Sequence, residues 1–168
     1  TSGYVTSLSQ EIPIVADKGA LVNLVSTSVY KTINENLIGA VKFYLKDLYG
    51  LNDDDVRLSK RIKIPSKRLR GFEAGKIGPV DQGDYVGGNY ATALNFEAQL
   101  PNLLPEATQT DVAAFLDFGN LWSVDYDSSA GSSSKLRSSV GVTTQLYTPI
   151  GPVNFVLAQP LSKAESDK

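Results

Sequence analysis

The sequence predicts an all-β fold: a segment of an antiparallel transmembrane β-barrel, with about seven strands and one long loop folded inward. Apolar and polar residues alternate with a period of two along most of the chain, as in strands with one buried face. Most alternating segments span about eight to thirteen residues, whereas strands of soluble sandwiches usually span about five or six. Short turns also alternate with longer loops, as in outer-membrane barrels.

Composition narrows the functional classes. The chain has 168 residues, 42% of them hydrophobic and 20% charged, and a formal charge of −2. It therefore has the size of one ordinary domain and lacks the overall positive charge of a nucleic-acid binder. Cysteine and histidine are both absent, which excludes thiol and imidazole chemistry. We predict no catalytic residue, no metal, no cofactor and no enzyme activity.

Membrane and targeting signals are sparse. No apolar run approaches the roughly 20 residues of a membrane helix, so any crossing must use strands. The first residues lack a signal-peptide pattern, and methionine is absent even at position 1. We therefore expect a processed or excised piece of a longer protein.

Three strands are predicted before the long loop. Residues 4–11 alternate, and a turn at Asp17-Lys18-Gly19 follows. Residues 20–33 are rich in Val, Ser and Thr, as strands are, and end at a turn formed by residues 34–36. Residues 37–49 place lysines and tyrosine on one face and apolar side chains on the other, which favours a strand over a helix.

Four more strands follow the loop. One begins at Tyr90 and another runs through 111–118, separated by a proline-bearing turn at 101–109. A polar Ser/Gly loop at 125–135 leads to a strand at 136–147. A tight turn at 148–152 then leads to the last predicted strand, 153–158.

The region 51–89 is too long for a hairpin loop and is rich in glycine and proline. Its basic run, 60–70, predicts a solvated face or contact with anionic lipopolysaccharide. Residues 52–55 lack the spacing of a calcium loop and predict a hydrated turn. Residues 83–88 do not open a helix after a strand, so a phosphate-binding loop is rejected.

Two acids occupy the polar face of neighbouring strands. If a hairpin turns near Ala107, Glu97 and Asp117 lie almost directly opposite each other on one face. Such a pair must point into the lumen, because an acid facing lipid costs a few kcal/mol near the midplane. Like charges so placed need a cation between them.

Arg70 is the candidate for that cation, because a planar guanidinium can bridge two carboxylates. It lies in the run Leu69-Arg70-Gly71-Phe72. Gly71 allows a tight backbone turn, and Phe72 is expected to pack into the barrel wall. Trp122, near a strand end, suits an interfacial aromatic belt.

Six short motifs follow one another along the chain from Leu69 onward, and their order is informative. After Arg70-Gly71-Phe72 come Ile77-Gly78-Pro79, Gly87-Gly88-Asn89, residues 115–122 (Phe-Leu-Asp-Phe-Gly-Asn-Leu-Trp), Ser139-Val140-Gly141 and Pro149-Ile150-Gly151-Pro152. From Leu69 onward the chain resembles the C-terminal barrel part of BamA-type outer-membrane assembly factors, the bacterial surface antigen barrel family. The POTRA domains, the first half of the barrel and the terminal strand of that family are absent. By this resemblance the arginine loop folds into the lumen and contacts acids at the positions of Glu97 and Asp117.

The resemblance implies residence in the bacterial outer membrane and non-covalent folding and insertion of other β-barrel proteins. Implied partners are client barrels, accessory lipoproteins, outer-membrane lipid and lipopolysaccharide, with no nucleic acid. One alternative is a two-partner-secretion pore, which shares the arginine motif and whose parent would carry two POTRA domains rather than five. Another is a soluble β-sandwich binding module.

Overall fold

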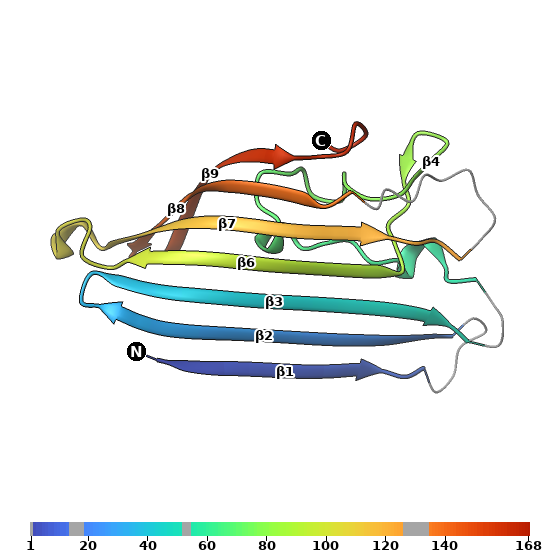
Figure 1. Cartoon of the computed structure of the whole chain (residues 1–168), viewed down its shortest axis with the longest axis horizontal. Coiled ribbons are helices and arrows are strands. Elements are labelled where there is room, and N and C mark those ends of the chain that lie inside the picture. Colours follow the sequence, from blue (N-terminus) through green and yellow to red (C-terminus); the bar gives the residue numbers. More distant parts are fainter. Residues whose placement is uncertain (1, 14–18, 52–54, 126–134) are drawn as a thin grey trace.

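A computed structural model describes residues 2–13, 19–51, 55–125 and 135–168. Seven of its strands form one antiparallel sheet in the order β1-β2-β3-β6-β7-β8-β9 (Figure 1). These strands are β1 (Gly3–Glu11), β2 (Ala20–Asn34), β3 (Leu37–Gly50), β6 (Tyr90–Leu100), β7 (Thr110–Trp122), β8 (Arg137–Thr148) and β9 (Gly151–Ser162). The all-β, seven-stranded prediction is confirmed.

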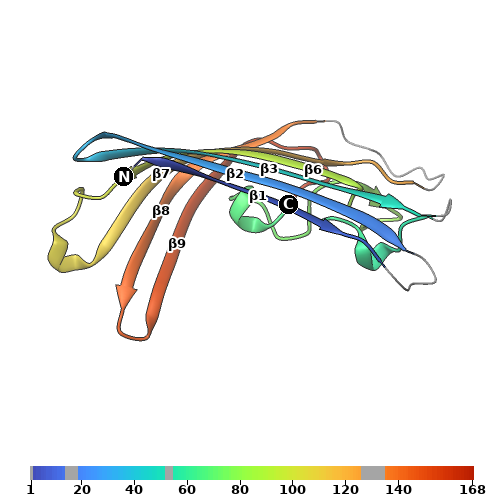
Figure 2. The same cartoon turned by 90° about the horizontal axis from the view of Figure 1, so that it is seen from below.

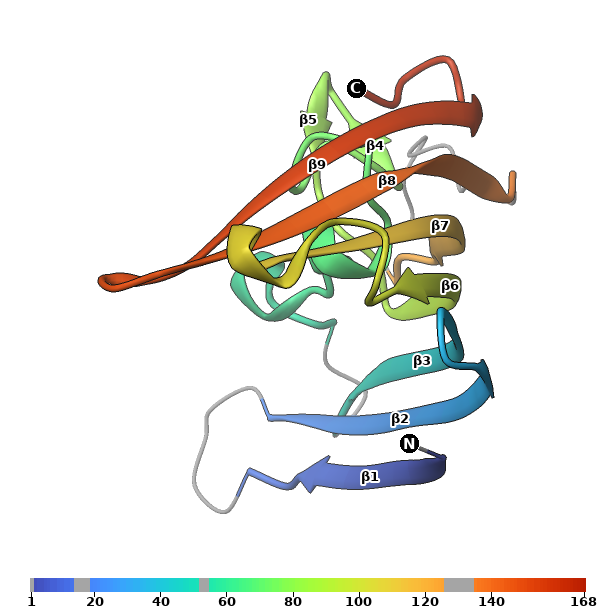
Figure 3. The same ribbon diagram turned by 90° about the vertical axis from the view of Figure 1, so that its left-hand side faces the viewer.

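The sheet is a single curved wall. Figures 2 and 3 show that the sheet is curved and that the region between β3 and β6 lies on its concave face. A soluble sandwich would need two sheets packed face to face, so that alternative is wrong for the described strands. No helix in the described part of the chain is long and apolar enough to cross a membrane.

Alternation determines which side chains face the lumen. On β7, Phe115, Asp117 and Leu121 point inward and are 3%, 0% and 0% exposed. Their outward neighbours Leu116 and Phe118 are only partly buried. Large apolar side chains remain exposed on the outward face of other strands: Val41, Phe43, Phe96, Val140, Val142, Phe155 and Leu157. This outward apolar surface has the character that lipid-facing strands require.

Two strand ends lie four residues beyond the sequence prediction. The last strand continues past Ala158 to Ser162, and β7 continues to Trp122. The last strand was predicted to end before Pro160, because proline cannot donate a ladder hydrogen bond. It is tolerated here because β9 pairs only with β8. The predicted turn at 17–19 and the loop at 125–135 fall largely outside the described residues, as do positions 52–54.

The long loop has structure of its own. It contains two 3₁₀ turns, Leu58–Lys60 and Ser66–Arg68, and a small hairpin of β4 (Val80–Asp81) and β5 (Asp84–Tyr85). Gln82 and Gly83 turn this hairpin with φ of 49° and 90°, the left-handed pair typical of two-residue turns. This hairpin was not predicted from the sequence.

An apolar core joins the loop to the wall. Leu69 from the loop is 2% exposed and clusters with Leu48 of β3 and Leu121 of β7, which are 1% and 0% exposed. Gly78 fits against Leu121 so closely that a Cβ would come within 2.6 Å of Cδ2. The loop therefore fills one end of the concave face as a packed plug.

Candidate functional site: the loop anchor inside the wall

The register of β6 and β7 corrects one prediction. Glu97 lies opposite Phe115, and Asp117 lies opposite Asn95. The two acids share the inward face, as expected, but are diagonal neighbours offset by two residues rather than opposite each other. The offset arises because the connection between the strands is centred one residue earlier than assumed, and it contains the 3₁₀ turn Glu106–Thr108 closed by Gln109 in the left-handed conformation.

Arg70 reaches Asp117 with both its main chain and its side chain. Its Nε donates to Oδ2 and its Nη2 to Oδ1, each at 2.7 Å, and its backbone N–H donates to Oδ2 at 3.1 Å. This is the bidentate fork that guanidinium and carboxylate geometry favours. Arg70 Nη2 also lies 3.0 Å from Glu97 Oε1, so one guanidinium contacts both acids.

Lys42 is a second cation that the prediction did not include. Its Nζ lies 2.5 Å from Glu97 Oε2, and it extends inward from β3, which pairs with β6. Arg70 and Lys42 together balance Glu97 and Asp117, so the site holds two charges of each sign. The alternation of residues along β3 already indicated that Lys42 points inward. Its partner Glu97 could not be identified, because that requires knowing that β3 pairs with β6 across the long loop.

Asn95 completes the surroundings of Asp117. Its Nδ2 lies 2.8 Å from Asp117 Oδ1 and 2.8 Å from the carbonyl oxygen of Arg68. Asp117 is fully buried, while Arg70 and Glu97 side chains are 11% and 10% exposed. A buried carboxylate requires such partners, because isolating it from water is costly. Asn95 therefore also attaches the wall to the loop, through its hydrogen bond to the main chain of Arg68.

An aromatic ring supports the flat face of Arg70. The guanidinium carbon lies 3.6 Å from the centroid of the Phe115 ring, and Phe115 is 3% exposed. Flat stacking on an aromatic face favours the planar guanidinium of arginine over the ammonium of lysine. Phe115 lies over Gly141 of β8, where a Cβ would approach its Cζ to 2.6 Å, so this glycine leaves room for the ring.

The neighbours of Arg70 in the motif are close to the wall. Gly71 has φ of +87°, and a Cβ there would lie 3.0 Å from the Cβ of Ala158 on β9. Both the backbone conformation and the close approach favour glycine. Phe72 is 9% exposed and belongs to the same apolar cluster as Leu69.

Part of the basic run turns inward, so the expectation of a solvated face is wrong for those residues. Arg68 Nη2 donates to Ser26 Oγ at 2.7 Å, and its guanidinium lies 5.3 Å from the Tyr44 ring centroid. Arg61 is 7% exposed and lies 2.5 Å from Asp125 Oδ1. Lys60, Lys63 and Lys67 remain exposed.

Asp125 forms a separate anchor just beyond β7. Its Oδ2 accepts the backbone N–H of Val56 at 2.6 Å, so it fixes the beginning of the loop while Arg61 pairs with Oδ1. Burial pushes the pKa of Asp125 upward, but the backbone hydrogen bonds from Val56 and from its own N–H, together with Arg61, outweigh burial and lower it. The carboxylate form is therefore favoured by folding.

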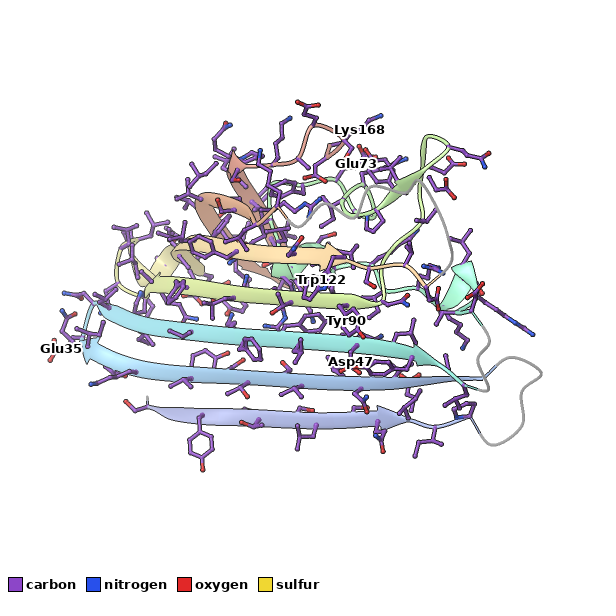
Figure 4. All side chains as sticks on the ribbon, turned by 45° about the vertical axis from the view of Figure 1, so that its right-hand side comes forward. Glu35, Asp47, Glu73, Tyr90, Trp122 and Lys168 are labelled. Carbon is purple, nitrogen blue, oxygen red and sulfur yellow. The ribbon has the colours of Figure 1, made fainter. Side chains whose placement is uncertain are left out.

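Trp122 lies in an outward aromatic row at the loop end of the sheet. Its ring stacks on Tyr90 with centroids 5.8 Å apart, and Tyr90 meets Tyr49 edge-on at 5.8 Å. Figure 4 shows Tyr90 and Trp122 together on neighbouring strands. Such a row has the composition of an interfacial belt.

A cavity of about 930 Å³ lies beside the anchor. It is lined by Arg70 and Phe72 of the loop and by residues of six strands, including Lys42, Gln99, Thr143 and Asn154. The described residues contain no group of three acidic side chains that could hold a metal ion. The ion pairs and hydrogen bonds of this site are suited to holding the loop against the concave face of the wall.

Comparison with known proteins agrees with this architecture. Residues 1–168 match the Omp85 superfamily domain. The chain is 32% identical over 130 residues to the "Outer membrane protein assembly factor BamA" of Neorickettsia risticii (strain Illinois), covering 73% of this chain and 17% of that protein. It also superposes on the crystal structure of BamA from Haemophilus ducreyi lacking POTRA domains 1–3, with a TM-score of 0.86 and 21% identity, covering 99% of this chain and 36% of that one.

Proposed function

This chain belongs to the Omp85 superfamily, and from that membership we propose that it is the C-terminal wall of an outer-membrane barrel whose parent folds and inserts other β-barrel proteins. The chain spans about a sixth of the length of its curated relative. The activity therefore belongs to the longer protein, and this piece contributes a stretch of wall and the loop that it holds.

The observation that carries the proposal is the anchored loop. Arg70 donates three hydrogen bonds to a fully buried aspartate and also contacts Glu97. Nothing in this site is arranged as a nucleophile beside a base, so the work proposed for it is conformational. The anchor keeps the loop in the lumen and gives the wall a fixed interior.

Assembly would then proceed without covalent chemistry. A strand edge of the parent barrel pairs with an incoming client strand, and main-chain hydrogen bonds template the next strand. The clients are unfolded β-barrel proteins of the outer membrane. Accessory lipoproteins and lipopolysaccharide are proposed partners of the parent, with the exposed lysines Lys60, Lys63 and Lys67 as the candidate contact for anionic lipid headgroups.

A secretion pore of the two-partner type is the second candidate, because the arginine motif is expected there too. The two functions are separated by reconstituting the full-length parent in liposomes and adding an unfolded client barrel protein. An assembly factor speeds client insertion, seen as a shift in gel mobility between heated and unheated samples. A secretion pore instead moves its polypeptide into the liposome lumen, where it is protected from protease, and leaves client insertion at the rate of empty liposomes.

A further inference from the structure

A second buried ion pair lies away from Arg70. Arg137, the first residue of β8, and Asp167 are both 0% exposed at their side chains. Arg137 Nε lies 2.8 Å from Asp167 Oδ2, and its Nη2 lies 2.9 Å from Oδ1. The remaining guanidinium nitrogen, Nη1, donates to Asn120 Oδ1 at 2.5 Å and to the carbonyl of Lys135 at 3.2 Å. Every guanidinium nitrogen therefore has an acceptor.

This pair folds the chain back after the last strand. Residues 163–168, which we call the strap, follow β9, and the backbone N–H of Ala164 donates to Asp167 Oδ2 at 2.6 Å. Counting backbone and side chain together, Ala164 and Asp167 are 8% and 4% exposed. The carboxylate thus closes a turn within the strap while the same group binds β8.

The strap also reaches the long loop. The N–H of Glu73 donates to the carbonyl of Lys168 at 2.8 Å, and the N–H of Lys168 donates to the carbonyl of Lys76 at 3.2 Å. Figure 4 shows Glu73 and Lys168 lying together. The hydroxyl of Tyr85, in the small hairpin, hydrogen-bonds to the carbonyl of Ser166. Three points of the loop are therefore attached to six residues of chain.

The attachment point is close to the anchor in sequence. Glu73 follows Arg70 by three residues, and Gly71 between them touches Ala158 of β9. Three residues of extended chain span at most about 10 Å, so displacing Glu73 must strain or move Arg70. The strap thus holds the loop at points separate from its contact with β6 and β7.

We propose that Arg137 and Asp167 are positioning residues for the arginine loop, acting through the strap. Their ion pair couples the end of strand β9 to the Arg70 anchor, so that a displacement of β9 is felt at Asp117. The inference rests on the proposed function only for its consequence in assembly. The coupling itself is a property of the fold.

The experiment measures amide hydrogen exchange in the full-length parent, in lipid, for peptides covering 69–76, 90–100 and 163–168. Asp167→Asn should speed exchange at 69–76 by at least about tenfold, because breaking one side of a buried ion pair opens the segment it holds. Exchange at 90–100 should not change. The matched control is Asp84→Asn, the same change at an exposed residue of the hairpin, which should leave 69–76 as in the wild type.

Conservative variants keep the test decisive. Arg137→Lys should raise exchange at 69–76 less than Arg137→Gln does, because lysine keeps the charge but not the fork. Tyr85→Phe removes one hydroxyl contact between the loop and the strap, so it should raise exchange at 69–76 by less than Asp167→Asn does. This milder variant provides the test if Asp167→Asn does not fold. Faster exchange confined to 163–168, or an equal rise at 90–100, would overturn the proposal. Faster exchange at 69–76 with undiminished client assembly would support the coupling and count against the proposed role of the anchor.

Discussion

Arg70 meets Asp117 edge to edge, with Nε and Nη2 each 2.7 Å from a different carboxylate oxygen. Glu97 is the lesser partner, because it contacts Nη2 alone and is also neutralised by Lys42. The anchor is therefore unequal: Asp117 depends on Arg70 for its charge compensation, whereas Glu97 keeps a cation if Arg70 is lost. This inequality distinguishes the two acids experimentally.

Glycine at position 71 is expected to matter for two separable reasons. Gly71→Ala adds strain at φ of +87° and places a Cβ 3.0 Å from Ala158 Cβ, whereas Gly83 has φ of +90° with nothing within 4 Å. Strain alone costs about 1–3 kcal/mol, so Gly71→Ala should lower the free energy of unfolding more than Gly83→Ala does. Urea unfolding of the two variants of the parent barrel measures the difference. Equal losses would mean that the contact with β9 contributes nothing.

The faces of β7 can be tested by placing arginine on each. Leu116→Arg should cost roughly 2–4 kcal/mol if the site lies near the bilayer midplane. Ala113→Arg should be tolerated better, because Ala113 lines the luminal cavity beside polar side chains. Folded barrel is scored by gel mobility with and without heating. If both variants fold equally poorly, the assignment of inside and outside is wrong.

The long loop and the turn between β8 and β9 lie at opposite ends of the strands, so they should face opposite sides of the membrane. Single cysteines replacing Lys60 or Asp84, both exposed in the long loop, should react with a membrane-impermeant thiol reagent on intact cells. A cysteine replacing Ile150, 96% exposed in the turn between β8 and β9, should react only after the outer membrane is opened. Residues 1–168 contain no native cysteine, so within them only the introduced thiol can react. Reaction of all three sites on intact cells would contradict a topology with the long loop outside the cell and the β8–β9 turn in the periplasm.

Acid should release the beginning of the loop. The pKa of Asp125 is lowered in the folded state from an ordinary value of 3.8, so its contribution to stability is complete above that value and is lost as pH falls through the lowered pKa. The protection factors of the Val56 and Arg57 amides, which correct for the pH dependence of intrinsic exchange, should therefore fall on acidification. Asp125→Asn should show low protection factors there already at neutral pH and little further change with acid. A pH response that survives in Asp125→Asn would assign it to another group.

Local pattern was sufficient to predict the strands and their faces. Alternation placed Glu97 and Asp117 on the inward side because a strand's side chains have a period of two, whatever its partner. It could not give their offset, since the register depends on the geometry of the turn at 101–109. The prediction that they lie opposite each other was wrong for that reason.

Two ion pairs between distant segments were not predicted from the sequence. Lys42 pairs with Glu97 across 55 residues, and Arg137 pairs with Asp167 across the last hairpin. Neither pair follows from spacing, because each depends on which strands are neighbours and on how the chain turns after β9. The small hairpin at Gln82-Gly83 did leave a signal, since an X-Gly pair between short extended segments favours a two-residue turn.

Arg70 and Asp117 hold the loop against the wall, and the parent is proposed to need this contact to assemble its clients. The direct test is a double-mutant cycle in the full-length protein with Arg70→Ala and Asp117→Asn, scored by barrel stability and by the amount of folded client barrel in the outer membrane. A parallel cycle uses Arg70→Ala and Glu97→Gln. Breaking a buried ion pair costs about 3–5 kcal/mol, so each single variant at Arg70 or Asp117 should impair both readouts and the double variant should add little. Coupling to Glu97 should be smaller, because Lys42 remains beside it. Strictly additive effects of Arg70→Ala and Asp117→Asn, or full client assembly in either single variant, would contradict the account.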